Sequence, residues 1–255
     1  MIELQGVSKR YGGETVVDQL SITVDTGELL VLLGGSGSGK TTTLKMINRL
    51  VAPTAGSVRV DGVDVSGIPE HDLRRRIGYV FQEVGLFPHM TVSDNVGITP
   101  KLLGWEPARV TRRVDELLSI IELEPSSVRD RWPHELSGGQ RQRVGVARAL
   151  AAGPSILLLD EPFGAVDPPT RRRLQDSLVH IRRHMDLTAV FVTHDMAEAL
   201  FLGDRIAVLR DGHLIQIGTP RELLADPADD YVTELVGTPQ RQADMFAALQ
   251  TDTET

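Results

Sequence analysis

The sequence contains no cysteine in 255 residues. This absence excludes a disulfide framework and a thiol nucleophile, and it fits a reducing cytosol without proving one. Long apolar runs are also missing, because no stretch approaches the roughly 18 residues that a membrane-spanning helix needs. The N-terminal residues MIELQGVSKRYGG lack the apolar core of a signal peptide. We therefore expect any contact with a membrane to be made through a partner.

Positive charge is scarce relative to negative charge. The chain has 27 Lys and Arg against 35 Asp and Glu, which gives a formal net charge of −8 at pH 7. This balance argues against unaided binding to nucleic acid or to anionic lipid. We therefore interpret the basic clusters 74–76 and 171–173 as solvated faces, and we expect no nucleic-acid partner. A hydrophobic content of 41% is enough for a substantial core.

Two strand patterns predict an α/β fold. Residues 2–24 alternate apolar and polar side chains, which is typical of short antiparallel strands with one wet face. Residues 28–33, 155–160 and 189–193 are instead continuous apolar runs with helical segments between them, as a doubly covered parallel sheet requires. The predicted fold is a parallel-sheet core with an antiparallel β subdomain.

A helical insertion and a C-terminal hairpin complete this prediction. Between Gln82 and His134 the pattern becomes mostly helical, and residues 109–123 carry apolar side chains at helical spacing. Residues 204–218 contain two strand patterns about an Asp-Gly turn, which is a strong hairpin signal. A helix is then predicted from Thr219, with Thr as the cap, Pro at the first position and Glu three residues on.

A glycine-rich loop follows the first continuous apolar run. Its sequence GGSGSGKT, residues 34–41, fits the pattern GxxxxGK[ST], with a buried strand before it and a helical stretch after it. The side-chain-poor backbone can turn its N–H groups onto a phosphate chain, and the helix adds its positive end. Lys40 would reach the β- and γ-phosphates of ATP, and the Thr41 hydroxyl would coordinate Mg²⁺. The residues expected to bind ATP here are Gly34, Gly35, Ser36, Gly37, Ser38, Gly39, Lys40, Thr41 and Thr42.

Two consecutive carboxylates follow the apolar run 156–159. Asp160 would lie beside the glycine-rich loop and hold Mg²⁺ through water. Glu161 is placed to polarise an attacking water as a general base. The alternative, a capping or salt-bridging role, would be preferred for this pair alone, but the glycine-rich loop favours the catalytic interpretation.

The run Leu136–Gln140, LSGGQ, resembles a second and smaller phosphate loop. It has a hydroxyl and two glycines that lead into a helical stretch, so we expect it to bind an anion. The alternative is an ordinary helix cap by Ser137, which uses the same unpaired amides. Two such helix starts suggest that they grip one nucleotide from opposite sides, across a dimer.

An ordered set of motifs resembles the ATP-binding subunits of ABC transporters. The set consists of GGSGSGKT, Gln82, LSGGQ, ILLLDEP, Gly164-Ala165-Val166-Asp167 and His194. The likeness covers about residues 1–237, which we expect to form one ABC ATP-binding domain with a helical subdomain at about 83–150. Residues 238–255 remain as a polar tail that we expect to fray. The resemblance implies the ABC ATPase fold, ATP hydrolysis, and ATP and Mg²⁺ as cofactors.

The same resemblance implies roles for single residues. Tyr11 would stack on adenine, Gln82 would sense the γ-phosphate and Mg²⁺, and His194 would fix the γ-phosphate and the attacking water. Asp167 would lie at the seam between subunits. Catalysis is thereby assigned to Glu161, His194, Gln82 and Lys40, and the metal to Thr41, Gln82 and Asp160. The second ATP-binding loop comprises Ser137, Gly138, Gly139 and Gln140, of which Ser137 and Gly139 would reach the γ-phosphate held by the partner subunit.

Three of these residues have simple alternatives. Tyr11 could be a surface aromatic, Gln82 a polar residue at a strand end, and His194 a helix cap. Their order and separations favour the functional interpretation.

Several stretches of the sequence resemble the corresponding stretches of importers for quaternary-ammonium osmoprotectants. They are TTTLKMINRL, IGYVFQEVGLFPHMTV, PKLLGW and PHELSGGQRQRVGVARAL. The implied function is uptake of glycine betaine, choline or carnitine. Another polar solute, such as an amino acid or a polyamine, and a soluble ABC-type switch without transport remain as alternatives. Some osmoprotectant ATPases carry C-terminal CBS domains; the sequence ends at Thr255, and gating by such domains is not expected.

The resemblance also implies partners. Two copies would form a homodimer, at least with ATP, on the cytoplasmic face of the cell membrane. Integral membrane permease subunits would dock on residues 83–90, which are apolar for a linker. The alternative for that segment is plain packing of the insertion. An extracytoplasmic substrate-binding protein would take part indirectly.

Overall fold

The computed structural model describes residues 1–164, 166–185 and 187–251, and within these residues the strands form two sheets. The smaller sheet is antiparallel and has the order β2-β1-β4-β5. Its strands are β1 (Ile2–Tyr11), β2 (Glu14–Val24), β4 (Ala55–Val60) and β5 (Val63–Asp64). The antiparallel layer predicted for residues 2–24 is therefore confirmed.

The larger sheet is the core of the protein and has the order β10-β9-β3-β8-β7-β6. All of its neighbouring strands are parallel except β9 and β10, which form an antiparallel hairpin. Its strands are β3 (Leu29–Leu33), β6 (Ile77–Val80), β7 (Ile156–Asp160), β8 (Thr188–Thr193), β9 (Arg205–Arg210) and β10 (His213–Gly218). The predicted parallel sheet and the hairpin at 204–218 are thus both confirmed.

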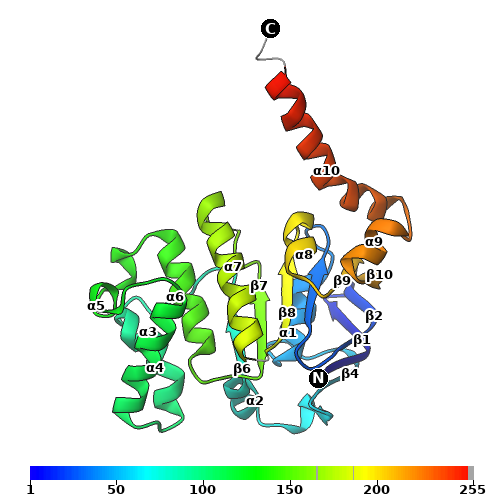
Figure 1. Cartoon of the computed structure of the whole chain (residues 1–255). Coiled ribbons are helices and arrows are strands. Elements are labelled where there is room, and N and C mark those ends of the chain that lie inside the picture. Colours follow the sequence, from blue (N-terminus) through cyan, green and yellow to red (C-terminus); the bar gives the residue numbers. More distant parts are fainter. Residues whose placement is uncertain (165, 186, 252–255) are drawn as a thin grey trace.

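Each face of the larger sheet has its own hydrophobic core. In β3, Leu30 and Leu32 pack with residues of the antiparallel sheet, whereas Leu29, Val31 and Leu33 pack with residues of the helical insertion. Figure 1 shows the antiparallel sheet on one side of the central strands and the green insertion helices on the other. Burial on both faces explains why these strands are continuous apolar runs.

The helices cover the central sheet and form the insertion. The covering helices are α1 (Lys40–Ile47), α2 (Glu70–Arg76), α7 (Pro168–Met185), α8 (Met196–Leu202) and α9 (Pro220–Ala225). The insertion contains α3 (Val92–Leu102), α4 (Pro107–Ile120), α5 (Pro125–Val128) and α6 (Gly138–Leu150). The predicted apolar stripe is on α4, where Val110, Val114, Leu117 and Leu118 are buried. The start of α9 has the predicted cap, with Thr219 and Glu222 bonded reciprocally.

The last helix, α10 (Asp230–Thr251), continues through the position where we expected the chain to fray. Residues 238–251 are helical, in keeping with the strong helix formers Ala243, Ala247 and Ala248. Residues 252–255 of the predicted tail, and Ala165 of the motif before Asp167, lie outside the described residues. Figure 1 shows α10 leaving the body of the molecule beside α8 and α9. Among the described residues, no helix has the length and apolar character to cross a membrane.

Candidate functional site

The candidate site lies at the carboxyl edge of the central sheet, where ligands bind in open α/β folds. The glycine-rich loop follows β3, and Gln82 follows β6. Asp160 ends β7, Glu161 follows it, and His194 follows β8. The sheet order places β3, β8, β7 and β6 side by side, so residues from distant parts of the sequence meet at one edge.

The glycine-rich loop passes directly into α1. Its last residue, Gly39, caps the helix with a φ of 93°, a left-handed conformation that favours glycine. A Cβ there would come within 2.7 Å of the Val16 carbonyl oxygen, so the loop also needs glycine for space. The loop backbone is thereby brought against the antiparallel sheet, at the positive end of a helix.

Lys40 is buried and bonded to its own loop. Its Nζ atom donates to the carbonyl oxygens of Gly34 at 2.8 Å and Gly35 at 2.7 Å. Burial lowers the pKa of the Lys40 ammonium, and the nearby carboxylates of Glu161 and Asp160 oppose that shift. The ammonium is therefore held at the loop by two carbonyl oxygens, and a phosphate oxygen can replace them as its hydrogen-bond acceptor.

Asp160 and Thr41 form the candidate metal site. The Thr41 hydroxyl donates to Asp160 Oδ1 at 2.7 Å, although the two residues are 119 positions apart. Asp160 is 3% exposed and also accepts a hydrogen bond from the Tyr79 hydroxyl at 3.3 Å. A carboxylate and a hydroxyl together offer the oxygen ligands that Mg²⁺ prefers. The residues present thus fit the ion that the sequence predicts.

Tyr79 was missed by the sequence reasoning. Burial, with the charge of Asp160 as a second cause, raises the pKa of Tyr79 well above its ordinary value, so the phenol stays protonated and donates to the carboxylate. The register of β6 against β7 pairs Tyr79 with Leu158, two residues before Asp160. The sequence signal that could have found Tyr79 is its hydroxyl-bearing side chain in the strand next to the one that ends at Asp160.

Glu161 and His194 lie together at the ends of β7 and β8. His194 Nδ1 is 3.2 Å from Glu161 Oε2. Glu161 has a φ of 43°, which is uncommon for a residue other than glycine and turns the chain sharply after the strand. A proton on Nδ1 can bridge the pair, so the carboxylate fixes the orientation of the imidazole.

A cavity of about 60 Å³ is lined by Glu161 and His194 and also by three further charged residues, Arg171, Asp195 and Glu198. Arg171 is within 3.7 Å of the Glu198 carboxylate and within 3.8 Å of the Asp195 carboxylate. Thr193 Oγ1 donates to Glu198 at 2.7 Å, and burial raises the pKa of the Glu198 carboxyl. Arg172 is exposed, but Arg171 is partly buried and paired, so the solvated-face interpretation is wrong for Arg171.

The LSGGQ loop starts α6 in the way that the capping alternative predicted. Gln140 N–H donates to the Ser137 hydroxyl at 3.2 Å, and Ser137 N–H donates to the Gln140 side chain at 2.9 Å. Within the part of the chain that the structure describes, no hydrogen bond or ion pair joins residues 136–140 to residues 34–41. The two glycine-containing loops are therefore separate sites in one chain. Capping does not conflict with anion binding, because the same helix start can serve both.

The remaining predicted residues lie at the surface. Gln82 is exposed just after β6, and Ser36 and Gly37 are exposed in the loop. Tyr11 is 47% exposed at the end of β1, with Lys9 Nζ 4.9 Å from its ring centroid. Asp167 is exposed and accepts a hydrogen bond from the Thr170 N–H at 3.0 Å, which caps α7. The structure leaves these side chains accessible to a ligand or to a second subunit.

Comparison with known proteins identifies the family. Residues 17–164 match the family model described as ABC transporter. The chain is 48% identical over 237 residues to the glycine betaine uptake system ATP-binding protein YehX of Escherichia coli (strain K12), covering 93% of this chain and 77% of that protein. The chain belongs to the ABC transporter family.

Two further relatives extend the comparison. The choline transport ATP-binding protein OpuBA of Bacillus subtilis (strain 168) is 49% identical over 238 residues, which cover 93% of this chain and 62% of OpuBA. The chain thus spans less than two thirds of the length of that relative. A dimeric, post-hydrolysis structure of the ATP-binding cassette MJ0796 bound to ADP and Pi has a TM-score of 0.79 and 34% identity, and covers 87% of this chain and 99% of that one. The ABC ATPase fold is therefore confirmed.

Proposed function

We propose that the protein is the ATP-hydrolysing subunit of an ABC importer for a polar solute. The observation that carries the proposal is the pairing of Glu161 with His194 at the sheet edge that also holds Lys40 and the Thr41–Asp160 bond. A phosphate loop alone would support nucleotide binding. A carboxylate beside it, paired with an imidazole, adds the group that water attack requires.

Each residue of the site has a proposed task. Lys40 binds the β- and γ-phosphates, and the loop N–H groups bind the remaining phosphate oxygens. Thr41, Asp160 and Gln82 hold Mg²⁺, which when bound neutralises charge on the phosphates. Glu161 accepts a proton from the attacking water, and His194 holds the γ-phosphate. Tyr11 stacks on the adenine.

The proposed working form is a homodimer. The loop of residues 137–140 would bind the γ-phosphate held by the partner subunit, and Asp167 would lie at the seam. The separation of the two loops within one chain supports this proposal, as does the dimeric state of the MJ0796 cassette. To shift an equilibrium from mostly open to mostly closed, ATP must favour the closed form by about 5.5 kcal/mol.

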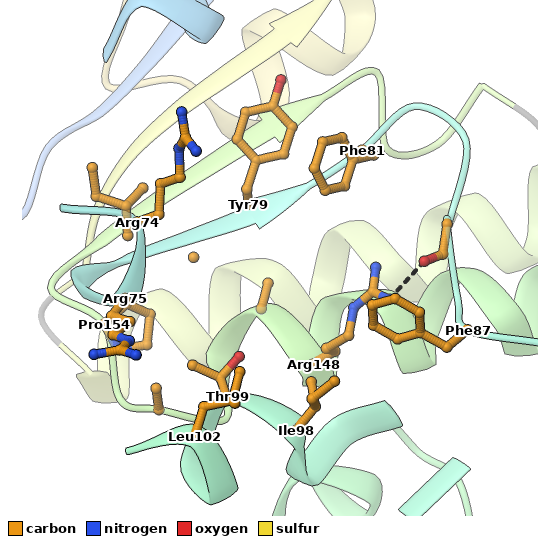
Figure 2. A pocket seen from close by; sticks show the side chains of 15 residues that line it. Arg74, Arg75, Tyr79, Phe81, Phe87, Ile98, Thr99, Leu102, Arg148 and Pro154 are labelled. Atoms are coloured by element: carbon orange, nitrogen blue, oxygen red, sulfur yellow. Dashed lines mark hydrogen bonds between the residues drawn. The ribbon is translucent and has the colours of Figure 1, made fainter. Parts of the chain in front are cut away.

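The proposed partners are permease subunits in the membrane, which would dock on a groove beside β6. The groove has a volume of about 320 Å³ and contains the exposed side chains of Phe81, Phe87 and Leu102. Figure 2 shows Phe87 beside Arg148, whose guanidinium donates to the Gly85 carbonyl oxygen at 2.7 Å. Because Phe81 in this groove is the neighbour of Gln82 in the sequence, a permease segment seated in the groove would move with the nucleotide site. Such docking would place the protein at the cytoplasmic face of the cell membrane.

For the solute, we propose a quaternary-ammonium osmoprotectant such as glycine betaine, choline or carnitine. The proposal is supported by the relatives named for choline transport and for glycine betaine uptake. Uptake of the three labelled solutes, in cells with and without this subunit, tests it directly. Unchanged uptake of all three would remove this solute class and leave the ATPase proposal standing.

The ATPase proposal is tested with purified protein. Wild type should hydrolyse ATP only with Mg²⁺. Glu161→Gln should bind ATP, lose turnover and accumulate a dimer that light scattering detects. Glu116→Gln is a matched control, because Glu116 is exposed on α4 and pairs only with Arg113 among the described residues. Near-normal turnover of Glu161→Gln would refute the base assignment.

A further inference from the structure

The start of α10 touches the glycine-rich loop. The Gly35 N–H donates to the Tyr231 hydroxyl at 3.2 Å, across 196 positions of sequence. The carbonyl oxygen of the same glycine accepts from Lys40 Nζ at 2.7 Å and from Ser38 Oγ at 2.9 Å. Gly35 is therefore held from both sides, by the loop through its carbonyl and by the C-terminal helix through its N–H.

Tyr231 is itself held firmly. The Arg210 guanidinium lies 5.1 Å from the centroid of the Tyr231 ring and also pairs with Asp229 at 3.2 Å. Asp229 caps the helix start by accepting from the Val232 N–H at 2.9 Å, and the Val232 side chain is fully buried. The Tyr231 hydroxyl therefore belongs to a part of α10 that is packed against the rest of the protein.

The same helix also lies beside the other half of the site. A cavity of about 230 Å³ separates the start of α8 from α10, and it is lined by His194 and Asp195 on one side and by Leu235, Thr238 and Pro239 on the other. Beyond this base α10 leaves the body of the molecule, as Figure 1 shows. A displacement of α10 would therefore act directly on Gly35, through the hydrogen bond from its N–H to the Tyr231 hydroxyl.

We infer that Tyr231 is a positioning residue, which ties the conformation of the phosphate loop to the C-terminal helix α10. The inference rests on the proposed ATPase function. A loop that contains Gly34, Gly35, Gly37 and Gly39 has many accessible conformations, and an anchored N–H reduces them. Loss of the anchor lowers the fraction of loops ready to bind phosphate, and the apparent affinity for ATP falls by the same factor.

Tyr231→Phe removes the hydroxyl and keeps the ring over Arg210. The expected result is a rise of about three- to tenfold in both the dissociation constant and the KM for ATP, because one hydrogen bond is lost. The kcat should stay unchanged, because the anchor acts equally before and during the reaction. The matched control is Thr233→Val, which removes an exposed hydroxyl from the same helix turn, where among the described residues it bonds only the Asp229 carbonyl oxygen.

A double-mutant cycle with Gly35→Pro, which removes the N–H donor, isolates the bond. In that background Tyr231→Phe should change ATP affinity no further. Equal effects of Tyr231→Phe in both backgrounds, or an unchanged KM in the single variant, would overturn the inference.

Amide hydrogen exchange at Gly35 gives a second readout that needs no ATP and no substitution in the loop. Exchange should be faster in full-length Tyr231→Phe than in wild type or Thr233→Val, because the N–H has lost its acceptor. Equal exchange in all three proteins also contradicts the inference. If wild type itself fails to bind ATP, the proposed function fails, and the exchange experiment still decides whether Tyr231 anchors the loop.

Discussion

His194 Nδ1 and Glu161 Oε2 lie 3.2 Å apart, at the ends of two neighbouring strands. The imidazole is 64% exposed in its side chain and the carboxylate 21%, so the pair sits at the surface of the sheet edge with Glu161 on the inner side. In the proposed mechanism the carboxylate polarises a water while the imidazole contacts a phosphate. We therefore expect substitutions at the two residues to have separable effects.

His194→Ala should lower the kcat for ATP hydrolysis by about 10²-fold or more, since one donor positioned at the charge that develops on the reacting group contributes about 10²- to 10³-fold. The affinity for ATP should change much less, because Lys40 and the loop amides remain. A steady-state assay with a nucleotide-binding measurement separates the two effects. His213→Ala, on an exposed position of β10, is the control. Equal kcat values for both variants would show that His194 has no part in turnover.

Tyr79→Phe tests the hydrogen bond behind the candidate metal site. Asp160 would keep its bond from Thr41 and lose the one from Tyr79. We expect the Mg²⁺ concentration for half-maximal activity to rise by about tenfold, because groups that orient a metal ligand commonly contribute that much. Titration of activity with Mg²⁺ at saturating ATP measures the change. An unchanged Mg²⁺ requirement would mean that Thr41 alone orients Asp160.

The sequence was sufficient to predict the elements but not all of the contacts between them. The pattern of apolar residues predicted α4, because one face of that helix is buried. The continuous runs predicted β3, β7 and β8, because both faces of the sheet are covered. Motif spacing then located the glycine-rich loop, the position after the strand located Asp160 and Glu161, and the family resemblance added His194. Such signals are either local in the sequence or motifs that recur among related proteins.

The contacts of Tyr79, Tyr231 and Arg171 were not predictable in the same way. Tyr231 reaches Gly35 only because α10 packs against the core beside α8, and no periodicity in the sequence specifies that packing. Arg171 belongs to a basic triplet whose other members are exposed, so composition alone suggested a solvated face. Its pairing with Glu198 depends on how α7 meets α8 in space.

The buried carboxyl of Glu198 predicts a pH dependence of stability. Burial raises the pKa of Glu198 in the folded protein, so the folded state holds this proton more tightly than the unfolded state. As pH rises from the ordinary range of a glutamate through the raised pKa, the folded state must release the proton at a cost, and stability falls. The groups that face Glu198 are Thr193, Gln175, Arg171 and Asp195.

Glu198→Gln should remove this fall, since an amide does not titrate. Urea unfolding of both proteins from acidic to neutral pH gives the test. The free energy of unfolding of wild type, relative to the variant, should decrease as pH rises. The difference between the two proteins is the informative quantity, because other carboxylates titrate in both. A difference that is constant with pH would contradict the raised pKa.

Leu102→Glu tests the docking groove without touching the nucleotide site. Leu102 is 65% exposed on α3 and lines the groove beside β6. A carboxylate at this position would lose its hydration when an apolar partner binds, which makes docking less favourable. In the isolated protein the carboxylate stays in water, so no such cost arises. ATP hydrolysis by the purified subunit should therefore match wild type. Co-purification with the membrane subunits and solute uptake should both fall at least about tenfold, which corresponds to a loss of about 1.4 kcal/mol or more in binding free energy.

Leu224→Glu is the matched control, because Leu224 is 52% exposed on α9 and does not line the groove. If Leu102→Glu and Leu224→Glu support the same uptake, the groove is not where the permease binds, and the exposed side chains of Phe81, Phe87 and Leu102 require another explanation.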